Sequence, residues 1–295
     1  MRFVMTALLW LVTTVLLAAT LPAVWAQRHL VDSDGYAHFA QGAAADPKLQ
    51  DAMAAELATQ LSDLASNSGY DTDTDLLRAV TGSYTGSSAF PEQFAQANRF
   101  AHRWLFTNTV RSDLDSQGRW VVDLGPMLND SSIQQTLQSF GVTAPSSLPV
   151  PLTENAAAGL RPGQLQQVAR WGPWASVGLT ILTGIFAVLT LAVARRRGKA
   201  LVALGASAIL VGGAGWAGLE IGRRRLDGLL GNTPDDIRQI AESMVSHAVA
   251  GMHDWLNLSL LGGAGLVAVG LVATLLGGLW NRTSTRDAPT SAPAV

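Results

Sequence analysis

The segment ASVGLTILTGIFAVLTLAVARRRGK, residues 175–199, decides the fold class of this chain. Its first twenty residues carry no charge, and an α-helix of that length rises about 30 Å, the thickness of a hydrocarbon layer. Four of the last five residues are positive. Because short basic loops stay in the cytoplasm, the segment predicts a transmembrane helix whose carboxyl end lies inside the cell.

Two further apolar segments follow the basic residues, at 200–221 and 256–280. Glu220, near the end of the first segment, is the only ionisable side chain in the two. The sequence therefore predicts three transmembrane helices over residues 171–280, the first two forming a hairpin. We expect the tip of this hairpin inside the cell, at Arg195, Arg196, Arg197 and Lys199.

A fourth apolar segment, residues 3–21, lies at the start of the sequence and leaves two alternatives open. Residues 1–26 are either a transmembrane anchor or a signal peptide that is cut after Ala26. The small side chains of Val24 and Ala26 suit a cleavage site, whereas the apolar part exceeds the roughly 7–15 residues of a typical signal core. Its length favours the anchor, and both alternatives place residues 27–170 outside.

Charge and composition exclude several function classes. Charged residues make up 14% of the chain, against about 25% in an average soluble domain, and the chain contains no cysteine. A thiolate metal site, a cysteine nucleophile and a disulfide framework are therefore excluded. Residues 27–170 hold nine Lys or Arg and fifteen Asp or Glu, a net charge of −6. Such a domain is a poor partner for nucleic acid.

Helix signals dominate the first two thirds of residues 27–170. Asp46 before Pro47 places a capping carboxylate ahead of a proline at the first helical position, and predicts a helix to about Ala65. Apolar residues then recur at three- and four-residue steps, as on one face of a helix: Leu49, Met53, Leu57, Leu61 and Leu64.

Two more helices are expected before the pattern changes. One runs from about Asp75 to Val80, and the next begins near Pro91. Because amphipathic helices bury their apolar faces against each other, we expect the last of these helices to pack through one stripe: Phe94, Ala97, Phe100, Ala101, Trp104 and Leu105.

The rest of the chain adds little regular structure outside the membrane. Residues 120–124 predict a short strand, 133–140 a short helix, and 148–151 an extended piece that its prolines confine to an edge or a coil. Residues 234–255 predict an extracytoplasmic amphipathic helix, on the membrane surface or against the large domain, and 281–295 a disordered cytoplasmic tail. The fold class is mainly α, a helical membrane bundle of four segments plus a mostly helical extracytoplasmic domain with one short strand region.

A series of short motifs precedes the last three spans: Tyr36, Asp46-Pro47, Phe94 with Ala97-Asn98 and Ala101-His102, Val122 to Pro126, Gly141, and Leu148-Pro149. In this order of motifs the chain resembles a group of uncharacterised actinobacterial multispan integral membrane proteins. The resemblance implies one N-terminal span, an extracytoplasmic domain and three further spans. It implies no catalytic residue, because the group has no assigned activity.

Residues 71–75 hold three aspartates in alternation, as at the start of a calcium loop. Such a loop needs glycine at its sixth position and a bidentate glutamate at its twelfth. Those positions here are Leu76 and Gly82. We therefore expect a solvated loop in which Asp73 or Thr74 caps the next helix.

His102 and Asp123 are the candidates for a polar site in the extracytoplasmic domain. No serine elbow, paired carboxylate or second histidine at ligand spacing accompanies them. The structural alternatives are a hydrogen bond from His102 to a backbone carbonyl, and a turn or cap role for Asp123. His247 and His253 are six residues apart and point to different sides of a helix. The sequence thus predicts no catalytic, cofactor-binding or metal-binding residue.

Three arginines after the third span lie on the predicted outer side, against the positive-inside bias. They are a candidate ion-pair or lipid site, through pairing with Glu220, Asp227 or Asp235, or through anionic head groups of the outer leaflet. Glu220 lies too near the membrane boundary for a buried proton relay. The candidate site comprises Glu220, Arg223, Arg224 and Arg225.

Small residues repeat along the last two spans and let helix backbones approach closely. Ala214, Gly218 and Gly222 are four residues apart, and Gly263 and Gly270 are seven apart. This spacing predicts packing within the bundle, with self-association through Gly218 and Gly222 as the alternative.

These features favour an integral plasma-membrane protein that acts by binding, as a scaffold, sensor or accessory subunit of cell-envelope machinery. The expected partners are the lipid bilayer and other envelope membrane proteins, and no cofactor is expected. Two alternatives stay open. One is an envelope hydrolase or transferase that uses the extracytoplasmic domain, and the other is a small transporter or channel subunit.

Overall fold

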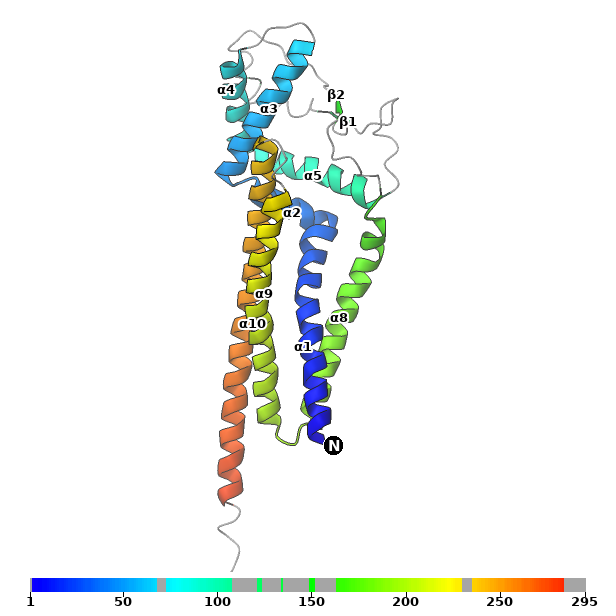
Figure 1. Ribbon diagram of the computed structural model, residues 1–295, viewed down its shortest axis with the longest axis vertical. Coiled ribbons are helices and arrows are strands. Elements are labelled where there is room, and N and C mark those ends of the chain that lie inside the picture. The colour runs from blue at the N-terminus through cyan, green and yellow to red at the C-terminus, as the bar shows by residue number, and fades with distance from the viewer. Residues whose placement is uncertain are drawn as a thin grey trace, which may run out of the picture. The chain divides into compact units, whose positions relative to one another are not determined.

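Four long helices dominate the computed structural model (Figure 1), which describes residues 2–67, 73–107, 121–123, 134, 149–151, 163–229 and 235–283. All four are long and apolar enough to cross a membrane. They are α1 (Arg2–Ala26), α8 (Gln166–Val193), α9 (Arg197–Leu229) and α10 (Asp235–Thr283). The four predicted membrane helices are thereby confirmed as helices of spanning length.

The chain divides into two compact units. The first unit contains most of the apolar helices and comprises Met1–Val24, Ala175–Ile221 and Met252–Val295. The second unit comprises Trp25–Trp174 and Gly222–Gly251. The predicted division at residues 26, 170 and 280 differs from this one because the second unit also takes in the end of α9 and the start of α10.

In the first unit, hydrogen bonds between side-chain hydroxyl groups link α1 to both α8 and α9. Two pairs of side-chain oxygens join α1 to α8: Thr20 to Thr183 at 2.8 Å and Thr13 to Thr190 at 3.4 Å. One pair joins α1 to α9: Thr14 to Ser207 at 2.8 Å. The threonines of α1 also donate to carbonyls one turn back, so their hydroxyls are satisfied in apolar surroundings. Helices α8 and α9, predicted as a hairpin, are joined by a short turn with α1 between them (Figure 1).

Helices α9 and α10 meet along a seam of glycines. A Cβ on Gly205 would lie 2.5 Å from the Gly263 carbonyl oxygen, and a Cβ on Gly270 would lie 2.7 Å from that of Gly198. On each helix the seam glycines are seven residues apart, two helical turns, so they return to the same face. The prediction that Gly263 and Gly270 pack within the bundle is confirmed.

The other predicted small-residue face behaves differently. A Cβ on Gly218 or on Gly222 would meet nothing within 4 Å among the residues that the structure describes. The described residues therefore provide no close helix contact at these two glycines. They lie on α9 one turn apart, beyond the part of the helix that touches α10 through Gly198 and Gly205.

The second unit is built from short helices around one apolar cluster. Its helices are the π-helix η1 (Gln27–Val31), α2 (Ser33–Ala43), α3 (Pro47–Asn67), α4 (Thr74–Thr85) and α5 (Phe90–Phe106). Helix α2 packs on α5, and α3 packs on α4. The cluster consists of Ala43, Ala44, Leu49, Tyr84 and Phe90, with Met53, Leu57, Phe94 and Met244 packed against it.

Local capping signals located the starts of α3 and α4 correctly. The side chain of Asp46 accepts a hydrogen bond of 2.9 Å from the Lys48 amide, ahead of Pro47. Asp73 accepts bonds from the amides of Asp75 and Leu76, at 2.9 and 3.3 Å. Both aspartates satisfy amides that have no partner within the first helical turn, which confirms the capping roles predicted for Asp46 and Asp73.

Two helices differ from the prediction. Helix α2 was not expected, although the Asp32 carboxylate caps it by accepting from the Gly35 amide at 2.8 Å. On α5 the predicted apolar stripe is wrong at Ala97 and Phe100, which are exposed. The buried face of α5 therefore differs from the predicted stripe. It includes the polar residue His102, which a stripe of apolar residues leaves out.

The predicted amphipathic helix over 234–255 and the last span are one continuous helix, α10. Its first part belongs to the second unit, where Met244 packs against the apolar cluster and the His247 ring lies 5.3 Å from the Phe39 ring. Contacts within the second unit therefore hold this part of α10, as the alternative of packing against the large domain predicted. The apolar face predicted for this helix from its periodicity thus contacts other residues of the protein, as Met244 shows.

Little of the segment between α5 and α8 is described. Strand β1 (Val121–Asp123) pairs antiparallel with β2 (Pro149–Pro151), with Val122 opposite Val150. Apart from Gln134, the short helix predicted over 133–140 lies outside the described residues, as do Asp71 and residues 284–295 of the predicted tail.

Candidate functional site

The candidate polar site around His102 joins η1, α2 and α5 of the second unit. The His102 side chain is 5% exposed. Its Nε2 lies 3.1 Å from the carbonyl oxygen of Leu30, which can only accept, so the ring nitrogen donates. The ring stacks on Phe106 at 4.1 Å and lies 5.2 Å from the ring of Tyr36. His102 therefore links α5 to the chain just before α2.

Two amide and hydroxyl bonds extend this cluster. The Tyr36 hydroxyl donates to the side-chain oxygen of Asn98 at 3.2 Å. The Asn98 amide nitrogen in turn donates to the Phe94 carbonyl at 2.9 Å. Asn98 and His102 are four residues apart, so they share one face of α5. Tyr36 of α2 meets both of them.

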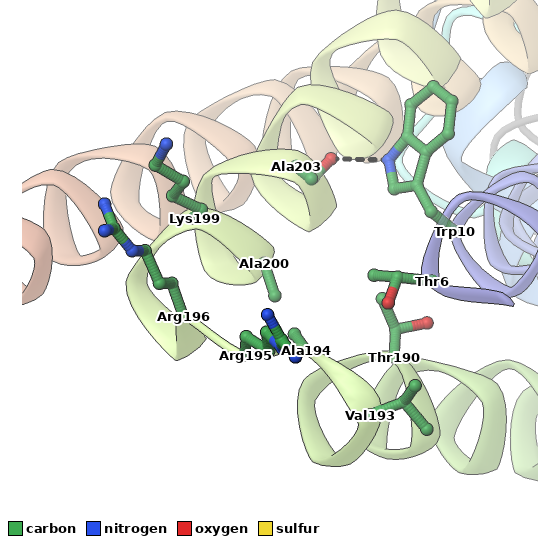
Figure 2. Close-up of a pocket in the computed structure, with 10 residues that line it drawn as sticks. All are labelled: Thr6, Trp10, Thr190, Val193, Ala194, Arg195, Arg196, Lys199, Ala200 and Ala203. Atoms are coloured by element: carbon green, nitrogen blue, oxygen red, sulfur yellow. Dashed lines mark hydrogen bonds between the residues drawn. The ribbon is translucent and has the colours of Figure 1, made fainter. Parts of the chain in front are cut away.

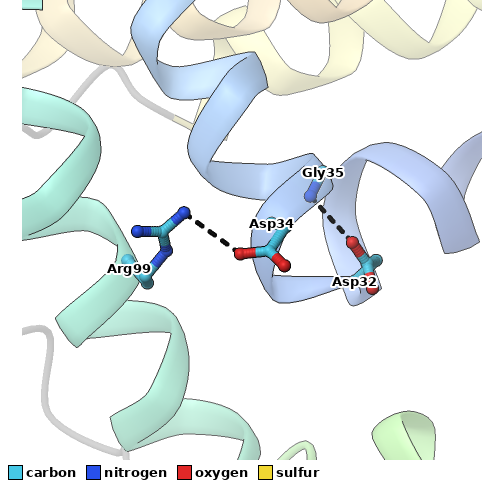
Figure 3. A network of polar contacts seen from close by, with 4 residues as sticks. All are labelled: Asp32, Asp34, Gly35 and Arg99. Atoms are coloured by element: carbon cyan, nitrogen blue, oxygen red, sulfur yellow. Dashed lines mark hydrogen bonds and ion pairs between the residues drawn. The ribbon is translucent and has the colours of Figure 1, made fainter. Parts of the chain in front are cut away.

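An ion pair at the surface flanks the cluster. Arg99 contacts Asp34 at 3.1 Å, and both side chains are exposed (Figure 3). Exposed pairs contribute about 0–1 kcal/mol to stability. Gly35 has a larger structural role, because a Cβ at this position would collide with the Arg28 carbonyl. The absence of a side chain there allows η1 and α2 to turn tightly against each other.

Burial shifts the pKa of both ionisable groups in the cluster toward the neutral form. It lowers the pKa of His102, and this effect outweighs the backbone hydrogen bonds from Leu30 and Val31 and the nearby Asp32 carboxylate. Burial also raises the pKa of Tyr36. A neutral, enclosed imidazole whose Nε2 is already bonded to the backbone is suited to hold helices together. It is poorly placed to exchange protons with a substrate.

This geometry predicts a pH dependence for the second unit. Unfolding exposes His102 and restores its ordinary pKa near 6.5, so below that pH the unfolded chain binds the proton more strongly than the folded protein does. Stability should therefore be constant above about pH 7 and fall as the pH drops through 6.5, by at most about 1.4 kcal/mol per pH unit. Urea unfolding of the full-length protein in micelles, measured by hydrogen exchange in α2 and α5, would report this slope.

The matched control for that experiment is His38 on α2, which is exposed. His102→Gln should remove most of the slope between pH 7 and 5.5, whereas His38→Gln should leave it unchanged. An unaltered slope in His102→Gln would contradict the assignment of the pH dependence to this residue.

The other predicted polar residues do not gather into one site. Asp123 ends β1, and its side chain lies outside the description of the structure. His253 stacks on Trp216 at 3.6 Å in the first unit, whereas His247 lies in the second. In the described part of the chain, no group of three His, Cys, Asp or Glu side chains is placed to hold a metal ion.

Basic residues gather at both ends of α9, in the turn before it and near its carboxyl end. Glu220 and the three arginines Arg223, Arg224 and Arg225 are exposed near the carboxyl end of α9. At the other end, Arg195, Arg196 and Lys199 line a pocket of about 750 Å³ in the first unit (Figure 2). Sequence reasoning treated the residues of this turn as a topology signal alone. The row of basic residues is visible in the sequence. The pocket could not be predicted from it, because part of the lining comes from α1, which is distant in the sequence.

No protein family, no curated protein and no solved structure matches this chain.

Proposed function

We propose that this protein is a multi-pass plasma-membrane protein that acts by binding, as a scaffold, sensor or accessory subunit of cell-envelope machinery. The four apolar helices hold it in the bilayer, and the second unit, on the extracytoplasmic side, provides the binding surface. The resemblance to uncharacterised actinobacterial multispan proteins is part of this proposal. Self-association through Gly218 and Gly222 is an additional way for the protein to assemble.

One observation carries the proposal: the polar residues of the second unit are divided between its interior and its surface. The interior group around His102 is used for packing, as its bond to Leu30 and its stacking on Phe106 indicate. The carboxylates lie instead on exposed helix surfaces: Asp51, Asp63, Asp73, Asp75 and Glu92. An acidic helical surface favours a partner with a basic surface, because complementary charge speeds encounter and selects the partner.

Charge variants on α3 test this proposal directly. Asp51 and Asp63 are exposed on α3, so Asp51→Asn/Asp63→Asn should leave the fold unchanged and reduce the yield of envelope partners crosslinked in cells. The matched control is Asp51→Glu/Asp63→Glu, which retains both charges and should retain the yield. The measurement is quantitative mass spectrometry after crosslinking and capture of the full-length protein.

Two results would count against the proposal. One is the absence of any reproducible envelope partner in the wild-type capture. The other is loss of partners from the glutamate control as large as that from the asparagine variant, because that result would point to altered folding rather than altered charge.

A further inference from the structure

The pocket at the start of α9 combines cations and apolar walls. Its lining comes from the first half of α1, the end of α8, the turn that follows and the first turns of α9. Figure 2 shows Arg195 facing Thr6 and Thr190 across the pocket, whereas the side chains of Arg196 and Lys199 lie on the side away from Trp10 and extend away from Arg195. The pocket thus has a basic end and an aromatic end.

The cations of this pocket lack acidic neighbours in the part of the chain that the structure describes. Among the residues that the structure describes, none of Arg195, Arg196 and Lys199 forms a salt bridge, and all three side chains are exposed. No carboxylate contributes to the lining. Positive charges that line one pocket repel one another, so an anion bound at this end of the pocket would relieve the repulsion.

The remaining lining is apolar or weakly polar. Val193, Ala194, Ala200 and Ala203 form the walls, and the Trp10 indole donates to the Ala203 carbonyl at 2.8 Å. This bond fixes the indole against α9, and the alanines leave the space open. An apolar chain could lie along these walls while its charged end meets the arginines.

The position of the pocket along the helices matches a lipid head group. Two segments of spanning length, Gln166–Val193 and Arg197–Arg225, flank the turn that carries Arg195 and Arg196. Residues between two consecutive spans lie at the membrane surface, where phosphate groups are found. The neighbouring α1 and α8 surfaces carry exposed apolar side chains that suit acyl chains: Val4, Leu8, Leu11, Val188 and Leu189.

We propose that this pocket is a binding site for one anionic phospholipid. The phosphate lies at the basic end of the pocket beside Arg195, and the exposed side chains of Arg196 and Lys199 turn toward it. The glycerol and first acyl carbons lie along the alanine walls toward Trp10. The lipid thereby joins α1 to the turn between α8 and α9. This site is separate from the arginines at the other end of α9 and does not depend on the function proposed for the second unit.

Quenching of Trp10 by brominated lipids tests the site. The full-length protein is placed in nanodiscs of phosphatidylcholine that contain increasing fractions of brominated phosphatidylglycerol, and parallel samples contain brominated phosphatidylcholine. The difference between wild type and Trp10→Phe isolates the signal of this indole. We expect phosphatidylglycerol to be preferred at Trp10, and the preference to fall about fivefold for each cation removed.

The chain provides a charge-matched control. Arg195→Gln/Arg196→Gln/Lys199→Gln should abolish the preference, whereas Arg223→Gln/Arg224→Gln/Arg225→Gln removes the same number of charges and should retain it. Quenching by brominated phosphatidylcholine should be equal in both variants, which shows that Trp10 keeps its surroundings. Because both leaflets of the nanodisc have the same composition, the result does not depend on orientation.

A variant that retains every charge distinguishes a lipid bound in the pocket from lipids that are attracted to the surface by charge alone. Ala200→Phe fills the pocket, and native mass spectrometry should then show loss of the bound phosphatidylglycerol. Retention of the lipid by Ala200→Phe, equal loss in the two glutamine variants, or no preference in the wild type would each overturn the proposal. Displacement of the lipid by inorganic phosphate, but not by chloride at equal ionic strength, would also overturn it, by assigning the site to a free anion.

Discussion

Phe90→Ala is expected to lower the free energy of unfolding of the second unit by about 3–5 kcal/mol. Phe90 is 2% exposed and lies in the apolar cluster with Leu49 and Tyr84. Its ring meets the Tyr84 ring edge to face at 5.5 Å and the Phe94 ring at 5.6 Å. Truncation removes the buried ring and leaves a cavity where α3, α4 and α5 meet.

The effect should be large because this cluster is small. The other four residues of the cluster cannot expand to fill the space, since two are alanines and two, Leu49 and Tyr84, are already fully buried. Native-state hydrogen exchange of α3 and α5 in the full-length protein, held in micelles, gives the free energy directly. Exchange in α1 and α8 should change little.

Phe100→Ala provides the control on the same helix. Phe100 is 43% exposed, and the Arg103 guanidinium lies 4.6 Å from the centre of its ring. Loss of this exposed contact should cost at most about 1 kcal/mol. A cost for Phe100→Ala equal to that of Phe90→Ala would contradict the placement of the core.

Gly205→Leu is expected to destabilise the packing of α9 on α10 by about 3 kcal/mol. A Cβ on Gly205 would lie 2.5 Å from the Gly263 carbonyl oxygen and 2.8 Å from the Val267 amide nitrogen. Both obstacles are backbone atoms, which cannot rotate away as a side chain can. The two helices must therefore separate, and they lose the close contact along the seam from Gly198 to Gly212.

The midpoint of thermal unfolding in mild detergent would measure this loss, and Gly218→Leu is the control. Gly218 lies on the same helix, and a Cβ there would meet nothing within 4 Å among the described residues. This control should leave the midpoint unchanged or raise it slightly, because leucine favours the helix more than glycine does. An equal drop in both variants would contradict the seam. A change of oligomeric state in Gly218→Leu alone would support self-association through that face.

Much of the local structure was predictable because its causes lie close together in the sequence. A run of twenty uncharged residues such as 175–194 forms a spanning helix wherever its neighbours lie. Asp46 and Asp73 cap helices through amides two or three residues away. The helix after Asp32 has the same kind of cap but was not predicted, because it is short and contains two glycines, which weaken its helical pattern.

The candidate site was only partly predictable. His102 could be named as a candidate because it is a histidine on a predicted helix, but its acceptor, Leu30, is 72 residues away in the sequence. The predicted stripe on α5 included Phe100 and omitted the face of Asn98 and His102, because hydrophobicity does not show that a polar residue is buried. Only a neighbouring helix that supplies its hydrogen-bond partners can make such burial favourable.

The sequence by itself determined that the chain has four apolar helices and where charge gathers between them. These properties follow from hydrophobicity and capping, which act over a few residues. Only the tertiary structure decided that α1 lies between α8 and α9, that Gly205 meets Gly263, and that Arg195 belongs to a pocket. A helix that is apolar on every side carries no pattern to say which face meets which neighbour. That choice depends on shape and on hydroxyl pairs such as Thr14 and Ser207, which are 193 residues apart.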